Sequence, residues 1–90
     1  MGAPNSIVMD PQVLEQLQGL DRLQLEKALN DLCRPFGQVK RMEIFENGKG
    51  GYICFVDLAT LGETAVLRRH LGGFGFGHSA GFRIPAKGDK

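Results

Sequence analysis

Two strand-like segments lie on either side of a glycine-rich turn: residues 39–45, in which apolar and polar residues alternate, and residues 52–58, which are almost all apolar. The turn contains the dipeptide Asn47-Gly48, which is a strong signal for a tight β-hairpin. The second segment (YICFVDL) is rich in β-branched and aromatic residues, which favour strands. The sequence therefore predicts an antiparallel hairpin around which the rest of the chain folds.

A helix is expected on each side of this hairpin. Residues 21–36 carry apolar side chains at steps of three and four, and Asp21 with Gln24 forms a capping-box pattern at the start. Thr60 and Glu63 form the same pattern at the start of a second helix, which ends at a pair of glycines. Each helix has one apolar stripe with which it can pack against a sheet.

The segment 13–20 (VLEQLQGL) fits either a helix or a strand. Its leucines have a helical spacing, but apolar and polar residues also alternate along it. A short strand is expected at 82–84, after a glycine-rich connection. With 13–18 taken as a strand, the order predicts an α+β protein, a ferredoxin-like β-α-β-β-α-β sandwich. Its four-stranded antiparallel sheet would carry two helices on one face and leave the other face open for binding.

The composition is that of a single globular domain. The chain has 90 residues, 42% of them hydrophobic, and a formal net charge of +1. These values exclude a disordered or fibrous chain, and the small charge means that nucleic-acid binding would have to rest on a local patch. We expect a flexible tail at 1–11, one domain at 12–87 and a tail at 88–90. No apolar stretch reaches the ~20 residues of a membrane span, so no membrane partner is expected.

The residues with chemical reactivity do not form an enzyme motif. Cys33 and Cys54 lie in apolar segments, so we expect buried, reduced thiols and an intracellular protein, nuclear or cytoplasmic. His70 and His78 lack partners at metal-ligand spacing, so no metal or cofactor is expected. The G-x-S-x-G pattern at 77–81 has no histidine after it and no room for the helix it needs. No catalytic residue is therefore expected.

Several short patterns resemble the RNA recognition motif family. Residues 29–37 (LNDLCRPFG) are similar to its L-x-x-L-F-x-x-F-G pattern, and residues 54–58 (CFVDL) to the end of its RNP octamer, [GA]-F-V-x-[FY]. Residues 71–77 (LGGFGFG) resemble its L-N-G-x-x-[FL]-x-G link into the last strand. The resemblance covers about residues 13–87. It implies binding of single-stranded RNA on the open sheet face, without catalysis.

The resemblance also indicates which residues would contact RNA. With Phe55 at the central aromatic position of the octamer, Ile53 and Asp57 share the open face with it, and no unpaired carboxylate is buried. The hexamer of the family corresponds to 15–20, with Gln16 where an aromatic residue is usual. The expected RNA-binding residues are Gln16, Arg41, Phe45, Lys49, Ile53, Phe55 and Arg83.

A protein-interaction module is the alternative, in which the domain binds a peptide or self-associates through its helical side or its sheet face. Some domains similar to the RNA recognition motif hold a peptide against their helical side, over an acidic first helix. The residues expected for this role are Glu26, Asp31, Phe74 and Phe76. Of the two phenylalanines, Phe74 is the expected exposed contact, and Phe76 is expected to pack into the core beneath the last strand.

Overall fold

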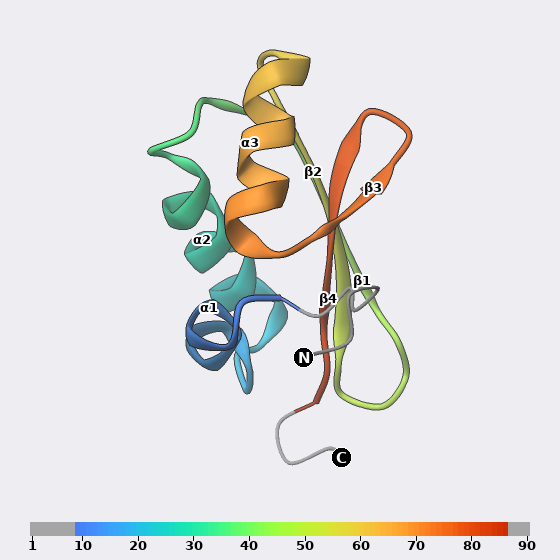
Figure 1. Ribbon diagram of the computed structural model, residues 1–90. Coiled ribbons are helices and arrows are strands. Elements are labelled where there is room, and N and C mark those ends of the chain that lie inside the picture. The colour runs from blue at the N-terminus through green and yellow to red at the C-terminus, as the bar shows by residue number, and fades with distance from the viewer. Residues whose placement is uncertain (1–8, 87–90) are drawn as a thin grey trace, which may run out of the picture.

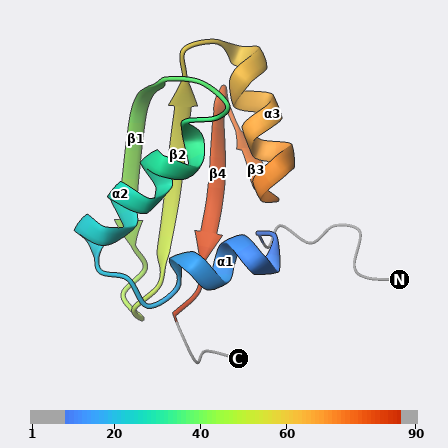
Figure 2. The same cartoon turned by 90° about the vertical axis from the view of Figure 1, so that its left-hand side faces the viewer.

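The fold is described by a computed structural model for residues 9–86. Its elements are α1 (Pro11–Leu17), α2 (Arg22–Cys33), β1 (Val39–Glu46), β2 (Tyr52–Leu58), α3 (Leu61–Leu71), β3 (Phe74–Phe76) and β4 (Ser79–Ile84). The four strands form one antiparallel sheet in the order β1-β2-β4-β3. The three helices of this part of the chain lie together on one face of the sheet (Figures 1 and 2). An α+β protein with a four-stranded antiparallel sheet is thus confirmed.

The central hairpin and the two predicted helices form as the sequence indicates. At the turn between β1 and β2, the Asn47 side chain accepts hydrogen bonds from the backbone N–H groups of Lys49 and Gly51, at 2.8 and 3.1 Å. Both predicted capping boxes, at the starts of α2 and α3, are present. The left-handed backbone of Gly72 ends α3, with φ of 78°, a conformation that favours glycine.

The expected strand at 13–18 is wrong, because these residues lie in helix α1 and not in the sheet. The Asp10 side chain accepts a hydrogen bond from the N–H of Gln12 at 2.9 Å, and Pro11 occupies the first turn, where its missing N–H costs nothing. Leu17 is buried on the inner side of this helix. The helical spacing of the leucines therefore prevails over the alternating pattern, and the described chain has three helices instead of two.

The glycine-rich connection supplies the missing strand. Residues 74–76 form β3 and turn back through Gly77, whose φ of 61° suits a tight hairpin, into β4. The expected strand at 82–84 is therefore longer, beginning at Ser79. β4 pairs with β2 on one side and β3 on the other, so it is a central strand of the sheet.

The core lies between the sheet and the helices. It includes Leu29 of α2, Val56 of β2, Leu67 of α3 and Phe82 of β4, all fully buried. Met9 is also buried, at 1% exposure, so the packed unit begins before residue 12 and the expected tail at 1–11 is too long. The remaining parts of the expected tails, 1–8 and 87–90, lie outside the described residues.

Candidate functional site

The sheet face opposite the helices carries the candidate site. Cys54 and Val56 are fully buried beneath the helices, so the alternate residues of β2 point to the opposite face. The expected direction of Phe55, away from the helices, is therefore confirmed. Across the β1–β2 pair, Phe55 lies opposite Glu43 and Asp57 lies opposite Arg41. Among the described residues no helix covers this face (Figure 1).

Four aromatic side chains from three strands gather on the open face. We call Phe45, Phe55, Phe74 and Phe76 the phenylalanine cluster. Phe55 lies at its centre, with ring centroids 4.9 Å from Phe76, 6.0 Å from Phe45 and 6.2 Å from Phe74. Phe76 is 62% exposed and Phe45 is 53% exposed, so these two rings offer the most surface to a ligand.

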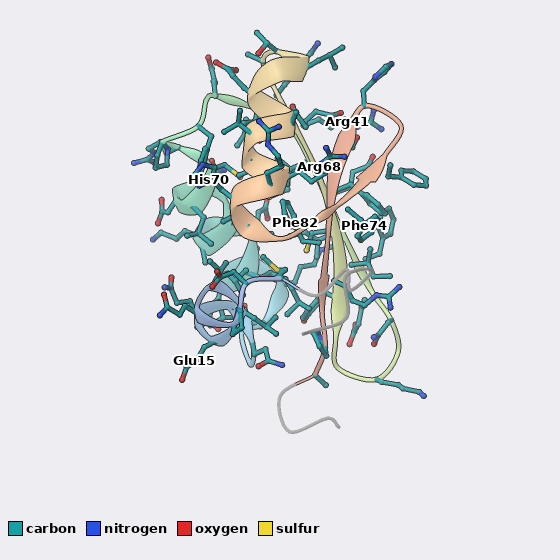
Figure 3. All side chains as sticks on the ribbon, in the orientation of Figure 1. Glu15, Arg41, Arg68, His70, Phe74 and Phe82 are labelled. Atoms are coloured by element: carbon teal, nitrogen blue, oxygen red, sulfur yellow. The ribbon has the colours of Figure 1, made fainter. Side chains whose placement is uncertain are left out.

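Phe74 reaches across the sheet to cover a position without a side chain. Gly81 of β4 pairs with Phe55 on one side and with Phe74 on the other. The Phe74 ring lies against Gly81, and Figure 3 shows its side chain on the side of the sheet away from the helices. The central strand β4 has no aromatic residue of its own on the open face, but the Phe74 ring of β3 covers it there.

Donors and acceptors surround the phenylalanine cluster. The Arg41 guanidinium donates a hydrogen bond of 2.7 Å to the Glu43 carboxylate. This bond, together with the nearby negative charges of Glu43 and then Asp57, raises the pKa of Arg41 above its ordinary value. Asp57 lies on this face as expected, but its Oδ1 atom is buried and has no hydrogen-bond partner among the described residues, so the expectation that no unpaired carboxylate is buried is wrong. The open face therefore carries an acceptor that is not satisfied by the fold itself.

These groups enclose a shallow hollow of about 380 Å³. It is lined by three members of the phenylalanine cluster and by polar residues of β1, β2 and β4: Arg41, Glu43, Phe45, Phe55, Asp57, Phe76 and Ser79. Its size is in the range of sites for small ligands, and its lining combines aromatic rings with hydrogen-bond donors and acceptors.

Most of the expected RNA-binding residues share this face. Arg41, Phe45, Ile53, Phe55 and Arg83 have the outward register on β1, β2 and β4. Two expected residues do not join them. Gln16 is exposed on α1, on the helical side of the sheet, and Lys49 is exposed at the β1–β2 turn.

Sequence reasoning assigned no contact to three residues that line the hollow, Glu43, Asp57 and Ser79. The alternation in β1 and β2 already places the first two on the face of Phe55, so the signal was present. Ser79 was not expected in a strand at all, because its segment was taken as a connection.

The residues of the alternative protein-binding set are not brought to one surface. Glu26 and Asp31 are exposed on α2, on the helical side, whereas Phe74 and Phe76 belong to the phenylalanine cluster on the open face. The expected roles of the two phenylalanines are also reversed. Phe76 is exposed and not a core residue, and Phe74 is partly buried against Gly81.

Comparison of the chain with family models, with curated proteins and with solved structures finds no match. Within residues 9–86, no helix has the length and apolar character required to cross a membrane. The same part of the chain contains no group of three or more side chains arranged to hold a metal ion.

Proposed function

We propose that this protein binds single-stranded RNA on the open sheet face, with bases stacked on the phenylalanine cluster. The observation that carries the proposal is the hollow, where the exposed rings of Phe45 and Phe76 lie beside donors and acceptors. Proteins that read single-stranded RNA combine aromatic stacking with hydrogen bonds to base edges. The open face offers both within one surface.

The order of the strands supports a relationship to the ferredoxin-like sandwich in a rearranged form. β2 and β3 are both antiparallel to β4, which lies between them. β2 and β3 are therefore parallel to each other, and helix α3 connects them along the chain. This is one of the two split β-α-β units of that sandwich. We infer that β4 takes the place of its first strand, moved from before α2 to after β3.

A contact at the end of β4 supports the rearrangement. The side-chain N–H of Gln18 donates a 3.1 Å hydrogen bond to the backbone oxygen of Pro85. Pro85 directly follows β4, and Gln18 lies just before α2. These are the two points that an unrearranged chain would join directly, passing from its first strand into its first helix.

In this arrangement the rings have positions similar to those of the RNA recognition motif. That family presents aromatic residues on the two central strands of its sheet. Here Phe55 lies on the central strand β2, and Phe74 covers Gly81 on the central strand β4. We infer that these two rings form the centre of the stacking platform and that the more exposed rings of Phe45 and Phe76 lie at its sides.

The charges of the open face predict modest affinity. Arg41 is paired with Glu43, and Asp57 adds another negative charge, whereas Arg83 and Lys49 have no ion pair among the described residues. Few phosphates can therefore be neutralised, so the affinity for RNA should fall only gently with rising salt concentration.

The proposal is tested by titrating the protein with short single-stranded RNA pools while its amide NMR signals are followed. Signals of all four strands should move, whereas those of α2 should not. Phe76→Ala should lose about 1–3 kcal/mol of binding free energy if one base stacks on this ring. Leu23→Ala, at a residue of α2 that is 78% exposed, is the matched control and should bind normally. Absent shifts on the sheet, or equal affinity of both variants, would contradict the proposal.

Self-association through the same face is a second candidate. The exposed rings of Phe45 and Phe76 form an apolar centre with charged residues around it, and an apolar core with a polar rim is typical of protein interfaces. Measurement of the molar mass over a range of protein concentrations tests it. A dimer that Phe76→Ala dissociates and Leu23→Ala leaves intact would favour this candidate, and a monomer at all concentrations would reject it.

A further inference from the structure

The Asp57 carboxylate is the polar group of the hollow whose hydrogen bonding the fold does not complete. It lies on β2 directly opposite Arg41, and its Oδ1 atom has no hydrogen-bond partner in the described part of the chain. Leaving a buried acceptor unpaired has a cost in free energy, and such groups in folded proteins are usually satisfied by a partner. Asp57 lines the hollow, and turning its side chain about the Cα–Cβ bond, together with the soft Cβ–Cγ bond, presents both oxygens to a donor there.

Arg41 presents the opposite chemistry a short distance away. A guanidinium has five N–H donors in a planar fork, and the 2.7 Å bond to Glu43 engages the Nη2 atom. The remaining donors are available to acceptors on a ligand without breaking this bond. The hollow therefore combines a carboxylate acceptor with a guanidinium donor, beside the rings of Phe55 and Phe76.

Among the four RNA bases, guanine matches this combination best. Its Watson–Crick edge has two adjacent donors, N1–H and the N2 amino group, which can bind both oxygens of one carboxylate. Its other edge has two acceptors, O6 and N7, which suit an arginine. Adenine and cytosine offer a carboxylate only an amino group, and uracil offers only one ring N–H.

Resting on the proposed function, we propose that the hollow is a guanine-selective subsite within the RNA-binding face. Asp57 reads the Watson–Crick edge of the base, Arg41 binds its acceptors, and Phe55 and Phe76 stack on its plane. Asp57 and Arg41 decide which base is bound, and the phenylalanines hold any base. Selectivity and overall binding thus depend on different residues.

The experiment measures affinities for short oligouridine RNAs in which one central residue is uridine, adenosine, guanosine or inosine. Inosine is guanosine without the N2 amino group, so it removes one of the two donors without any change in the protein. Guanosine should bind about tenfold more tightly than uridine or inosine, as expected for loss of one hydrogen bond to a charged group. Asp57→Asn should abolish this preference, read as the ratio of the affinities for the guanosine and uridine RNAs within that variant, because the loss of a negative charge also raises its affinity for every RNA. Asp31→Asn on α2 removes the same charge elsewhere and should keep the preference.

The outcomes separate the subsite from the proposed function. Equal affinity of the wild-type protein for all four RNAs overturns the guanine subsite and leaves RNA binding intact. Binding to none of them overturns both. A preference for guanosine over uridine that inosine shares, or that Asp57→Asn retains, overturns the role of Asp57. Since the inosine comparison uses the unaltered protein, it decides the question even if the Asp57 variant is unstable.

Discussion

The ring of Phe74 lies so close to Gly81 that a methyl group added at Gly81 would come within 2.5 Å of two ring carbons. The two residues are partners on neighbouring strands, and the ring covers backbone that would otherwise face solvent. Glycine weakens a strand because it has no side chain to pack, and an aromatic side chain from the next strand compensates for this. The contact therefore stabilises a three-residue edge strand on a central strand.

This contact predicts that Gly81→Ala and Phe74→Ala are strongly coupled. Gly81→Ala should destabilise the protein by about 1–3 kcal/mol, since the new methyl group displaces the Phe74 ring. In the Phe74→Ala background the same substitution should cost much less, because the obstructing ring is absent. Urea unfolding of the wild type, both single variants and the double variant measures the coupling. Additive changes in the free energy of unfolding would show that the ring does not rest on Gly81.

A buried hydroxyl links the start of α3 to the end of β2. Thr64 is 4% exposed, and its Oγ1 accepts a hydrogen bond from the Leu58 N–H at 2.9 Å and donates one to the Thr60 oxygen at 3.1 Å. Thr64→Val keeps the shape but leaves the Leu58 N–H unpaired, so it should destabilise the protein by about 1–3 kcal/mol. Thr64→Ser keeps the hydroxyl and should cost less. Equal losses for the two variants in urea unfolding would contradict the role of the hydroxyl.

The two buried thiols predict a loss of stability at alkaline pH. Burial raises the pKa of Cys33 from its ordinary value of 9.0 to about 11, and that of Cys54 to about 12. The unfolded chain therefore releases these protons at lower pH than the folded chain does. Their effect on stability is absent below about pH 9 and becomes increasingly unfavourable between about pH 9 and pH 11.

The measurement is the fall in Tm between about pH 8 and about pH 10.5, compared between the wild type and Cys33→Ala/Cys54→Ala. Lysines and Tyr52 are common to both proteins, so the comparison isolates the thiols. The fall should be smaller in the double variant, whatever its Tm at neutral pH. An equal fall in both proteins would mean that solvent reaches the thiols before the protein unfolds.

The pair formed by Arg41 and Glu43 predicts a gain in RNA binding. Glu43→Gln removes a negative charge from the open face and leaves Arg41 free to contact phosphate. Affinity for single-stranded RNA should increase, with a steeper dependence on salt, while Tm stays nearly unchanged because the pair is exposed. Asp31→Asn breaks the exposed pair with Arg34 on α2 and is the matched control. Equal gains from both variants would indicate an effect of net charge alone.

The sequence predicted correctly those elements that are stabilised by residues close to one another in the chain. The capping boxes at Asp21 and Thr60 and the Asn47-Gly48 turn each satisfy backbone groups within a few positions, so the sequence predicts them directly. The segment 13–18 was ambiguous because its leucines satisfy both periods. The structure resolves the ambiguity in favour of the helix, with Asp10 as its N-cap and the proline after it in the first turn.

The strands β3 and β4 were harder to predict because tertiary contacts make them possible. β3 has only three residues, one of them glycine, and strand propensity is weak there. Its pairing becomes favourable because β4 is already held by β2, and because Phe74 covers Gly81. The outward residues of β1 and β2 were predicted correctly because they follow from the local alternation of side chains. The packing of Phe74 and Phe76 against Phe55 was not predicted, because it depends on the pairing of β3 with β4.

The position of β4 has a consequence for synthesis of the protein. β4 separates β2 from β3, yet it is made after both of them. Until β4 has left the ribosome, the β2 edge of the β1–β2 hairpin is unpaired and β3 has no partner strand, so the four-stranded sheet can form only after β4 emerges. A nascent chain halted before Ser79 would expose an open strand edge, which is the feature that chaperones and aggregation both exploit.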